Sequence, residues 1–453
     1  MKTFDLVVIG GGSAGLKAAR VAGKQGYKVA VAEEHALGGE CFWAGCVPTK
    51  AMIRAAHIWH LVSRAKEFGV HPEQVRTDFA KAMAFKDRAM FEVEGDPNSD
   101  AGISKMGGVL YRTHARFEGA HEVRVGDEVI RGEKIILATG TTPTVPPIPG
   151  LAEAGFMTNR EIVNITTLPK RLVVLGAGVI GLEFAQTFRR FGAEVTVLEL
   201  GSEILPREDT DVAVAVRALL EREGVQILTS THLESVERLG SEKRLSLKVG
   251  EERKTILCDE ILVATGRRAA VGSLNLEAAG LALERDYLKV DNYLQTSLPH
   301  IYAPGDIHGA YLFTHVASYE GRIATQNAFG KSHTPVDYRV IPRATFLDPE
   351  IASVGLTEAE VIATGVPYKA LRFDFKDLDR AILHASKEGF VKLLIDARDG
   401  QVLGGHILGH EASSLLGEIA VVMQNRLPIS AISSTMHAFP SFPEAIEAAA
   451  LQV

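Results

Sequence analysis

The sequence predicts an α/β protein with two similar doubly wound domains followed by a C-terminal α+β domain. A buried strand, a glycine-rich turn and a helix follow one another at the N-terminus, and the same pattern returns 166 residues later. From about residue 336 the sequence alternates apolar and polar side chains, which is typical of antiparallel strands. A chain of 453 residues, 46% of them apolar, accommodates roughly three domains of ordinary size.

The first pattern lies at the N-terminus. Residues 4–9 predict a buried parallel strand that enters "GGGSAG", where Gly10, Gly12 and Gly15 lie. A helix is predicted in "LKAARVAGKQG", and "YKVAVAE" predicts a second strand that ends at Glu33. This is the context of a Rossmann-like dinucleotide-binding unit. Its glycines let backbone amides approach a pyrophosphate, and its acid accepts hydrogen bonds from a ribose.

The second pattern is "RLVVLGAGVIGLEFAQTFRRFGAEVTVLE", with Gly176, Gly178 and Gly181 in the turn and Glu199 at the end of the second strand. The interval from the first glycine to the acid is 23 residues in both copies. One glycine turn of this type is weak evidence, but two in context with equal spacing indicate two dinucleotide-binding units.

Two further matched strands follow the glycine turns. "IILATG" ends at Gly140 and "ILVATG" ends at Gly266, one for each unit, and "TSLPHIYAPGD" predicts a strand and turn that end at Asp306. The proline-rich stretch "TTPTVPPIPG" is a candidate boundary. We therefore expect the second unit to be inserted into the first. The predicted domains are 1–145 with 275–335, the inserted unit 146–274, and the C-terminal domain 336–453.

Composition and charge restrict the partners. The net charge is −7, with both signs interspersed, so no basic stripe favours nucleic acid. No apolar run approaches the 18 or so residues of a membrane span, and the apolar part of "MKTFDLVVIGGG" is too short for a signal peptide. We expect a cytoplasmic protein without nucleic-acid or membrane partners. In that compartment a cysteine pair is more often catalytic or metal-binding than structural.

The stretch "GGECFWAGCVPTK" contains two of the three cysteines, Cys41 and Cys46. Pro48 suits the first turn of a helix, which would place Cys46 at the helix N-terminus, where the dipole favours a thiolate. Both cysteines follow the ribose acid of the first unit closely along the chain, which favours a redox role.

Two other readings of the cysteines are open. In "HIWH", His57 and His60 lie on one face of the helix that follows Cys46, so the two cysteines and two histidines form a loosely finger-like zinc set. The continuous helix makes a tetrahedral arrangement difficult, and we expect no metal. The cysteines could also be inert apolar residues, the role that we expect for Cys258.

The motifs, in their order, resemble the FAD-dependent pyridine nucleotide-disulfide oxidoreductases over nearly the whole chain. That family includes dihydrolipoamide dehydrogenase, glutathione reductase and mercuric reductase. The two glycine fingerprints, the cysteine stretch, "APGD" and "DPEIASVGLTEAE" carry the resemblance. It implies FAD in the first unit, a nicotinamide dinucleotide in the inserted unit, and a homodimer formed by the C-terminal domain, with the active site shared across the interface.

The resemblance also implies roles for cofactor-binding residues. Glu33 would bind the adenosine ribose of FAD, Asp306 the ribityl and phosphate region, and Ala115 the adenine through its backbone. In the second unit, Glu199 offers an acid for a ribose 2′-hydroxyl, and the next residues contain no arginine for a 2′-phosphate. We therefore expect NADH rather than NADPH.

The catalytic roles follow in the same way. Cys46 would be the thiol in charge-transfer contact with flavin, and Cys41 the thiol that exchanges with a dithiol or disulfide substrate. Lys50 and Glu183, from the "GLEFA" motif, would form an ion pair beside the reactive flavin nitrogen. From the residues alone, a solvated lysine and an exposed helical glutamate are the alternatives.

The chain departs from the family at its catalytic histidine. The family pattern His-x-His-Pro-Thr-x-x-Glu corresponds to "HAFPSFPE", in which Phe439 occupies the catalytic position, while His437 and Glu444 are retained. Phenylalanine cannot transfer a proton. Either His437 or Glu444 takes over, or the acceptor needs no base there.

The predicted function is electron transfer between NADH, FAD, the Cys41–Cys46 disulfide and a dithiol or disulfide substrate, as in dihydrolipoamide dehydrogenase. One alternative is an NADH diaphorase or transhydrogenase-like flavoenzyme that reduces a quinone, a metal ion or a second nucleotide. Another is a non-catalytic flavoprotein subunit of a complex. Mercuric reduction is disfavoured because the C-terminal "EAAALQV" contains no second cysteine pair.

Overall fold

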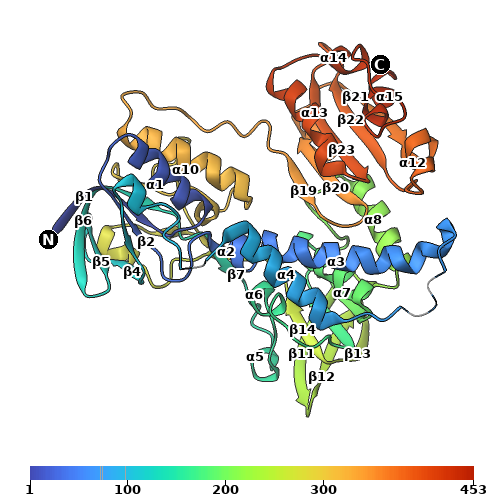
Figure 1. The fold of residues 1–453 in the computed structure, drawn as a ribbon, viewed down its shortest axis with the longest axis horizontal. Coiled ribbons are helices and arrows are strands. Elements are labelled where there is room, and N and C mark those ends of the chain that lie inside the picture. Colours follow the sequence, from blue (N-terminus) through green and yellow to red (C-terminus); the bar gives the residue numbers. More distant parts are fainter. Residues whose placement is uncertain (72, 74, 97) are drawn as a thin grey trace.

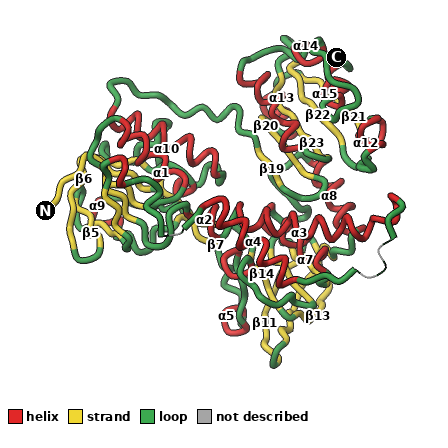
Figure 2. Tube along the Cα trace, viewed as in Figure 1, coloured by secondary structure: helices red, strands yellow, loops and turns green. Residues whose placement is uncertain are grey.

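The computed structural model describes residues 1–71, 73, 75–96 and 98–453, which form three lobes (Figures 1 and 2). The N-terminal lobe is formed by two separate segments of the chain, because residues near 300 return to the sheet that begins at residue 2. The middle lobe is formed by the intervening residues, and the C-terminal lobe by residues after about 340.

The sheet of the N-terminal lobe has the order β3-β2-β1-β6-β5-β4, with β18 paired to β6. Strands β1, β2, β3, β6 and β18 are parallel, and β4 and β5 form an antiparallel extension. The bounds are β1 Lys2–Ile9, β2 Val29–Ala32, β3 Val109–Tyr111, β4 Ala115–Phe117, β5 Glu122–Val125, β6 Glu128–Leu137 and β18 Ile301–Tyr302. The short elements are η2 Ser104–Met106, α9 Leu276–Ala279, β16 Leu283–Glu284, β17 Tyr287–Leu288 and η3 Asp306–His308.

Two helices pack against one another on this sheet, α1 (Ser13–Lys24) and α10 (Thr314–Phe329). Their contact is close because Gly321 has no side chain, and a Cβ built at this position would overlap the backbone of Ala14. The N-terminus of α10 is thereby held near the first glycine turn, although 300 residues separate them.

The middle lobe repeats the doubly wound arrangement. Its parallel sheet has the order β10-β9-β8-β14, and a three-stranded antiparallel sheet, β11-β12-β13, adjoins it. The strands are β8 Arg171–Leu175, β9 Glu194–Leu198, β10 Gln226–Leu228, β11 Thr231–Leu239, β12 Glu242–Val249, β13 Glu252–Cys258 and β14 Glu260–Val263. The helices are α5 Leu151–Ala154, α6 Asn159–Ile162, α7 Val179–Phe191 and α8 Thr210–Arg222.

Two short strands cross between these lobes, β7 (Thr141–Pro143) and β15 (Arg267–Ala269). They pair antiparallel with each other. The chain therefore enters and leaves the middle lobe side by side.

The segment that contains Cys41 and Cys46 leads into helices that lie on the middle lobe rather than on the N-terminal sheet (Figure 1). Helix α2 (Gly39–Trp43) precedes α3 (Cys46–Arg64), η1 (Ala65–Phe68) and α4 (Phe79–Glu94). Helix α3 packs along α7, where the rings of Trp59 and Phe191 meet edge to face with centroids 4.9 Å apart. The cysteines thus sit where the two nucleotide-binding lobes meet.

The C-terminal lobe is an antiparallel sheet, in the order β19-β20-β23-β22-β21, covered by helices. Its strands are β19 Arg343–Thr345, β20 Glu350–Gly355, β21 Tyr368–Asp374, β22 Phe390–Asp396 and β23 Val402–Gly409. Its helices are α11 Glu358–Thr364, η4 Phe375–Asp377, α12 Asp379–Leu383, α13 Ala412–Gln424, α14 Ser430–Ser433 and α15 Glu444–Ala450. This agrees with the alternation seen in the sequence.

Some predicted elements are shorter than expected. Strand β2 ends at Ala32, one residue before Glu33, and β18 has only two residues. Helix α1 ends at Lys24, because Gly26 takes a left-handed conformation, with φ of 86°, that turns the chain into β2. Within the described parts of the chain, no helix combines the length and apolar character needed to cross a membrane.

Candidate active site

A cavity of about 2830 Å³ runs along the junction of the lobes. Both glycine turns, the cysteine segment and the N-terminus of α10 line it. Its lining includes the predicted site residues Gly10, Gly12, Glu33, Cys41, Cys46, Lys50, Ala115, Gly140, Gly176, Gly178, Glu183, Glu199, Gly266 and Asp306. The structure therefore brings the cofactor-binding and catalytic candidates from several distant segments to one place.

The three glycines of the first turn have separate roles. Gly10 has φ of 102°, and a Cβ there would overlap the carbonyl oxygen of Ala138. A Cβ at Gly15 would overlap the carbonyl oxygen of Gly10, so this glycine lets α1 pack onto β1. A Cβ at Gly12 would meet no atom closer than 3.9 Å. Gly12 therefore leaves open space at the start of α1, as the pyrophosphate of a dinucleotide requires.

The second turn repeats this geometry. Gly176 also has φ of 102°, and a Cβ at Gly181 would overlap the Gly176 carbonyl oxygen. At Gly178 the space is open within 4 Å. Both turns thus fit a dinucleotide by the same physical criterion.

The two acids are held alike. Glu33 Oε2 accepts a hydrogen bond from the Gly11 amide at 2.6 Å, and Glu199 Oε2 accepts one from the Ala177 amide at 2.7 Å. The other oxygen of each carboxylate accepts from the amide two residues further along the chain. These bonds fix each carboxylate at the rim of its glycine turn, the place where a ribose hydroxyl can reach it.

Four further candidates surround the N-terminal part of the cavity. Ala115 begins β4 and is buried, and Gly140 and Gly266 follow β6 and β14 next to the lobe crossing. The carboxyl of Asp306 accepts a hydrogen bond from Thr141 Oγ1 at 3.5 Å. Burial raises the pKa of Asp306 to about 6. A buried carboxyl with one long hydrogen bond has remaining capacity for the hydroxyls of a bound FAD.

The two cysteines lie at the starts of neighbouring helices. Cys41 is in α2, and Cys46 is the first residue of α3, as predicted, with Thr314 Oγ1 at 3.5 Å from its sulfur. The hydrogen bond from the Cys41 thiol lowers the pKa of Cys46 to about 6, with help from Thr314 and the charge of Lys50. The same bond, together with burial, raises the pKa of Cys41. One thiolate beside one thiol is the form needed for disulfide chemistry.

Lys50 and Glu183 form an ion pair. Lys50 Nζ lies 2.7 Å from Glu183 Oε2, and the Phe346 amide donates to Glu183 Oε1 at 2.8 Å. The Glu183 side chain is only 4% exposed. Lys50 is engaged in an ion pair and Glu183 is buried, so the alternatives of a solvated lysine and an exposed helical glutamate are wrong.

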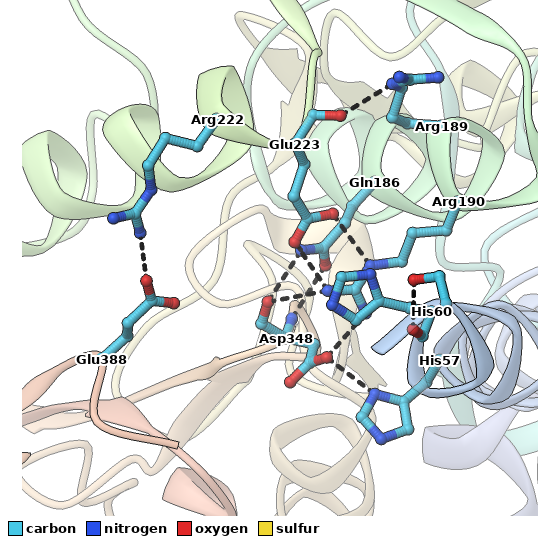
Figure 3. Close-up of polar contacts among 10 residues, drawn as sticks. His57, His60, Gln186, Arg189, Arg190, Arg222, Glu223, Asp348 and Glu388 are labelled. Atoms are coloured by element: carbon cyan, nitrogen blue, oxygen red, sulfur yellow. Dashed lines mark hydrogen bonds and ion pairs between the residues drawn. The ribbon is translucent and has the colours of Figure 1, made fainter. Parts of the chain in front are cut away.

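The histidines of the zinc hypothesis lie among other polar residues. Figure 3 shows His57 and His60 beside Asp348 and Arg190, and His57 Nδ1 lies 2.8 Å from Asp348 Oδ2. Arg190 Nη1 binds the same oxygen at 2.8 Å. Among the described residues, the cysteines and histidines form no metal-ligand group.

One group of three acids within the described residues has metal-ligand spacing, Asp209, Asp211 and Glu358. The ammonium of Lys392 lies within 2.6 to 2.9 Å of all three carboxylates. Lys392 therefore supplies the positive charge at their centre.

The residues that the sequence predicts at the position of the family's catalytic histidine lie apart from this cavity. Phe439 is 73% exposed. His437 is held between Glu418, at 3.0 Å, and Glu447, at 3.3 Å, and Glu444 accepts from the Ser441 amide at 2.6 Å. None of the three candidates lines the large cavity of its own chain.

Two residues of the site were not predicted from the sequence. Thr314 is separated from Cys46 by 268 positions, and no local pattern connects them. Glu40 lies directly beside Cys41 and binds Arg160 and Arg267. A charged residue within the cysteine stretch is a visible signal for Glu40, but its partners are not.

Two dinucleotide-binding lobes that meet at a dithiol define the class of nucleotide-dependent disulfide flavoenzymes. The chain belongs to the pyridine nucleotide-disulphide oxidoreductase family. Residues 4–321 match this family, and residues 341–450 match its dimerisation domain. The protein is therefore an FAD-dependent enzyme that uses a pyridine nucleotide.

Relatives agree with this assignment. A dihydrolipoyl dehydrogenase of Chlorobaculum tepidum is 34% identical, with 99% of this chain and 96% of the relative covered. A mercuric reductase of Lysinibacillus sphaericus is 32% identical over 99% of this chain and 82% of the relative. The HOCl-induced flavoprotein disulfide reductase RclA from Escherichia coli, in its Cu(II) complex, is similar in structure. Its TM-score is 0.88 at 30% identity, and both chains are fully covered.

Proposed function

We propose that the enzyme reduces a disulfide substrate with electrons from NADH, through a Cys41–Cys46 disulfide, in reversible steps like those of dihydrolipoamide dehydrogenase. The observation that carries the proposal is the position of the two thiols. Cys41 in α2 and Cys46 at the first residue of α3 both line the cavity that the two glycine turns share. The Lys50–Glu183 ion pair lies alongside, and its two charges act on the pKa of Cys46 in opposite directions, since Lys50 lowers it and Glu183 raises it.

The reaction at the cysteines consists of reduction of their disulfide and thiol–disulfide exchange with the substrate. When bound, FAD supplies two-electron transfer between a nicotinamide and a disulfide. The Cys41–Cys46 disulfide accepts two electrons and becomes a dithiol. The Cys41 thiol loses its proton to water or to the departing thiolate as its sulfur attacks one sulfur of the substrate disulfide and releases the first half of the substrate. Cys46 attacks the Cys41 sulfur, re-forms the internal disulfide and releases the second thiolate.

Protons for the released thiolates come from water or from the substrate. Phe439 supplies none, and the contacts of His437 and Glu444 within the chain engage both residues. An acceptor with acidic thiols needs no protein acid at this position. The dimerisation domain supports a homodimer in which this segment faces the partner's cysteines.

The nicotinamide preference is also a proposal. The carboxylate of Glu199 at the rim of the second turn favours a 2′-hydroxyl and repels a 2′-phosphate. Arg207, eight residues after Glu199, lines the same cavity. Comparison of the Kd values for NADH and NADPH tests the preference, and tighter binding of NADPH contradicts it.

A second candidate is an NADH diaphorase, and the phenylalanine at position 439, where the family pattern has its catalytic histidine, is the observation that favours it. An anaerobic NADH titration of the FAD-loaded enzyme separates the two functions. A redox-active disulfide takes up two electrons beyond those of FAD, about four per subunit, and long-wavelength thiolate absorbance appears early. The Cys41→Ser variant should take up only the two electrons of FAD. Two-electron uptake by the unaltered enzyme rejects the dithiol function in favour of the diaphorase.

A further inference from the structure

Glu40, the residue before Cys41, is the centre of an ion cluster. Arg160 donates to Glu40 Oε2 through Nη2 at 2.7 Å and to Glu40 Oε1 through Nε at 3.3 Å, which is a bidentate contact. Arg267 Nη2 lies 3.2 Å from Glu40 Oε1. Arg160 and Arg267 come from the middle lobe and from the lobe crossing, so Glu40 joins the cysteine segment to both.

Asn159 holds both ends of the short cysteine helix α2. Its side-chain amide nitrogen donates to Glu40 Oε1 at 2.7 Å and to the Ala44 carbonyl at 2.8 Å. Asn159 is buried and begins α6, which is capped by Thr158 and Glu161 in a capping box. A helix of five residues has little stability of its own, so these contacts determine where α2 lies.

Arg267 extends the cluster to the FAD side of the cavity. Its guanidinium donates to Thr141 Oγ1 at 2.7 Å and to the Thr141 carbonyl at 3.0 Å. Thr141 Oγ1 in turn donates to Asp306. A continuous path of polar contacts therefore runs from the residue beside Cys41 to the carboxyl that we assign to FAD.

Glu40 is in direct contact with two guanidinium groups. Burial raises the pKa of Glu40, but the hydrogen bonds from Arg160 and the charge of Arg267 outweigh it, and the resulting pKa is below the usual value. Glu40 is thus ionised, and its charge offsets part of the positive charge of Arg160 and Arg267 next to Cys41.

We propose that Glu40 is a positioning residue for Cys41. Through Asn159 and the two arginines, it fixes α2 against the middle lobe and sets the local charge that balances the dithiol against the disulfide. The proposal rests on the proposed function of Cys41 and Cys46. Since Arg160 and Asn159 belong to the middle lobe, the same contacts couple the position of Cys41 to the lobe that binds the nicotinamide dinucleotide.

Two variants with opposite charge effects test the proposal. Glu40→Gln leaves the guanidinium groups without their carboxylate, so it should shift the cysteine pair toward the dithiol, about fivefold in the equilibrium constant. Arg160→Gln removes a positive charge and should shift the pair toward the disulfide by a similar factor. The measurement is the dithiol fraction in glutathione redox buffers, determined by alkylation and mass spectrometry. A loss of structure alone would not move the two variants in opposite directions.

Activity assays add a second readout. In the FAD-loaded enzyme, Glu40→Gln should slow disulfide turnover about tenfold, the effect of one lost charge-assisted hydrogen bond. Electron transfer from NADH to ferricyanide, which bypasses the cysteines, should stay within about twofold. Glu388→Gln is the matched control, because Glu388 forms an exposed ion pair with Arg222 at 2.5 Å, away from the cavity.

The outcomes separate the two proposals. If the unaltered enzyme takes up only two electrons from NADH, the proposed function fails. If it takes up about four, and Glu40→Gln and Arg160→Gln both leave the dithiol fraction unchanged or shift it in one direction, the role of Glu40 is refuted. If Glu40→Gln does not fold, Arg160→Gln decides alone, and an unchanged dithiol fraction overturns the proposal.

Discussion

The hydroxyl of Thr314 lies at the first position of α10 and 3.5 Å from the Cys46 sulfur. Two helix N-termini, those of α3 and α10, therefore approach one sulfur atom. A helix N-terminus favours negative charge, and Thr314 adds a hydrogen-bond donor. This is a local reason for a thiolate at Cys46, independent of any group contributed by a partner subunit.

The charge of Cys46 should follow pH in a defined direction. Its pKa falls from the usual value near 9 to about 6, so the thiolate is present above pH 6 and is lost as pH falls through 6. In the two-electron-reduced enzyme, the long-wavelength thiolate–flavin absorbance should therefore titrate with a midpoint near 6.

Thr314→Val should raise this midpoint by about one pH unit, since it removes one hydrogen bond to the thiolate. Thr314→Ser should restore it, and equal midpoints in all three proteins would contradict the role of the hydroxyl.

At the scale of elements, each glycine turn combines packing and access. Gly15 and Gly181 allow a helix to approach its strand, whereas Gly12 and Gly178 leave space for a ligand. Local periodicity was sufficient to predict both turns, because the strand, turn and helix are contiguous in sequence. The same reasoning could not place the start of α10 beside the cysteines, since that contact depends on the packing of α10 against α1.

Replacement of Gly181 in the second turn should weaken binding of the second nucleotide without loss of FAD. In Gly181→Ala, the Cβ would overlap the Gly176 carbonyl, so α7 must move away from β8. We expect NADH binding to weaken at least about tenfold, while FAD content is unchanged because the first turn is intact. Fluorescence titration with NADH and the flavin-to-protein absorbance ratio measure the two effects. Gly417→Ala, at an exposed helical position where a Cβ meets open space, is the control and should bind NADH normally.

At the scale of the whole molecule, a polar row crosses the C-terminal sheet and faces the middle lobe. Strand pairing aligns its members across all five strands, in the order Arg343, Ser353, His406, Lys392 and Arg372. Ser353 donates to Glu208 at 3.0 Å, and Lys392 binds Asp209 at 2.8 Å. The seam between the C-terminal and middle lobes is thus electrostatically complementary.

Removal of the central charge in this seam should destabilise the protein. Lys392 is 4% exposed and neutralises three carboxylates. Lys392→Met leaves them unpaired, and we expect a loss of about 3–5 kcal/mol in the free energy of unfolding, measured by urea denaturation. Lys369→Met, at an exposed position on β21, should change stability by less than about 0.5 kcal/mol. Equal stability of the two variants would show that the seam contributes little.

The sequence predicted the elements that local patterns encode, and it did not predict contacts between segments that are distant in the chain. Two nucleotide-binding units and a different C-terminal domain followed from local patterns and were sufficient for the fold class. Lys50 and Glu183 were paired only through a family resemblance, because 133 positions separate them. The partners of Glu40 and the seam around Lys392 depend on how lobes pack, and neither propensity nor spacing encodes that packing.

The pairing of β7 with β15 has a consequence for how such a chain can arise. The two ends of the middle lobe are one strand spacing apart, about 4.8 Å, and hydrogen bonds connect them. A host fold that accepts an extra unit there keeps its own strands in register, since the insertion leaves and returns at one point. The middle lobe is thus attached through two adjacent strands, and its insertion leaves the strand order of the N-terminal sheet unbroken.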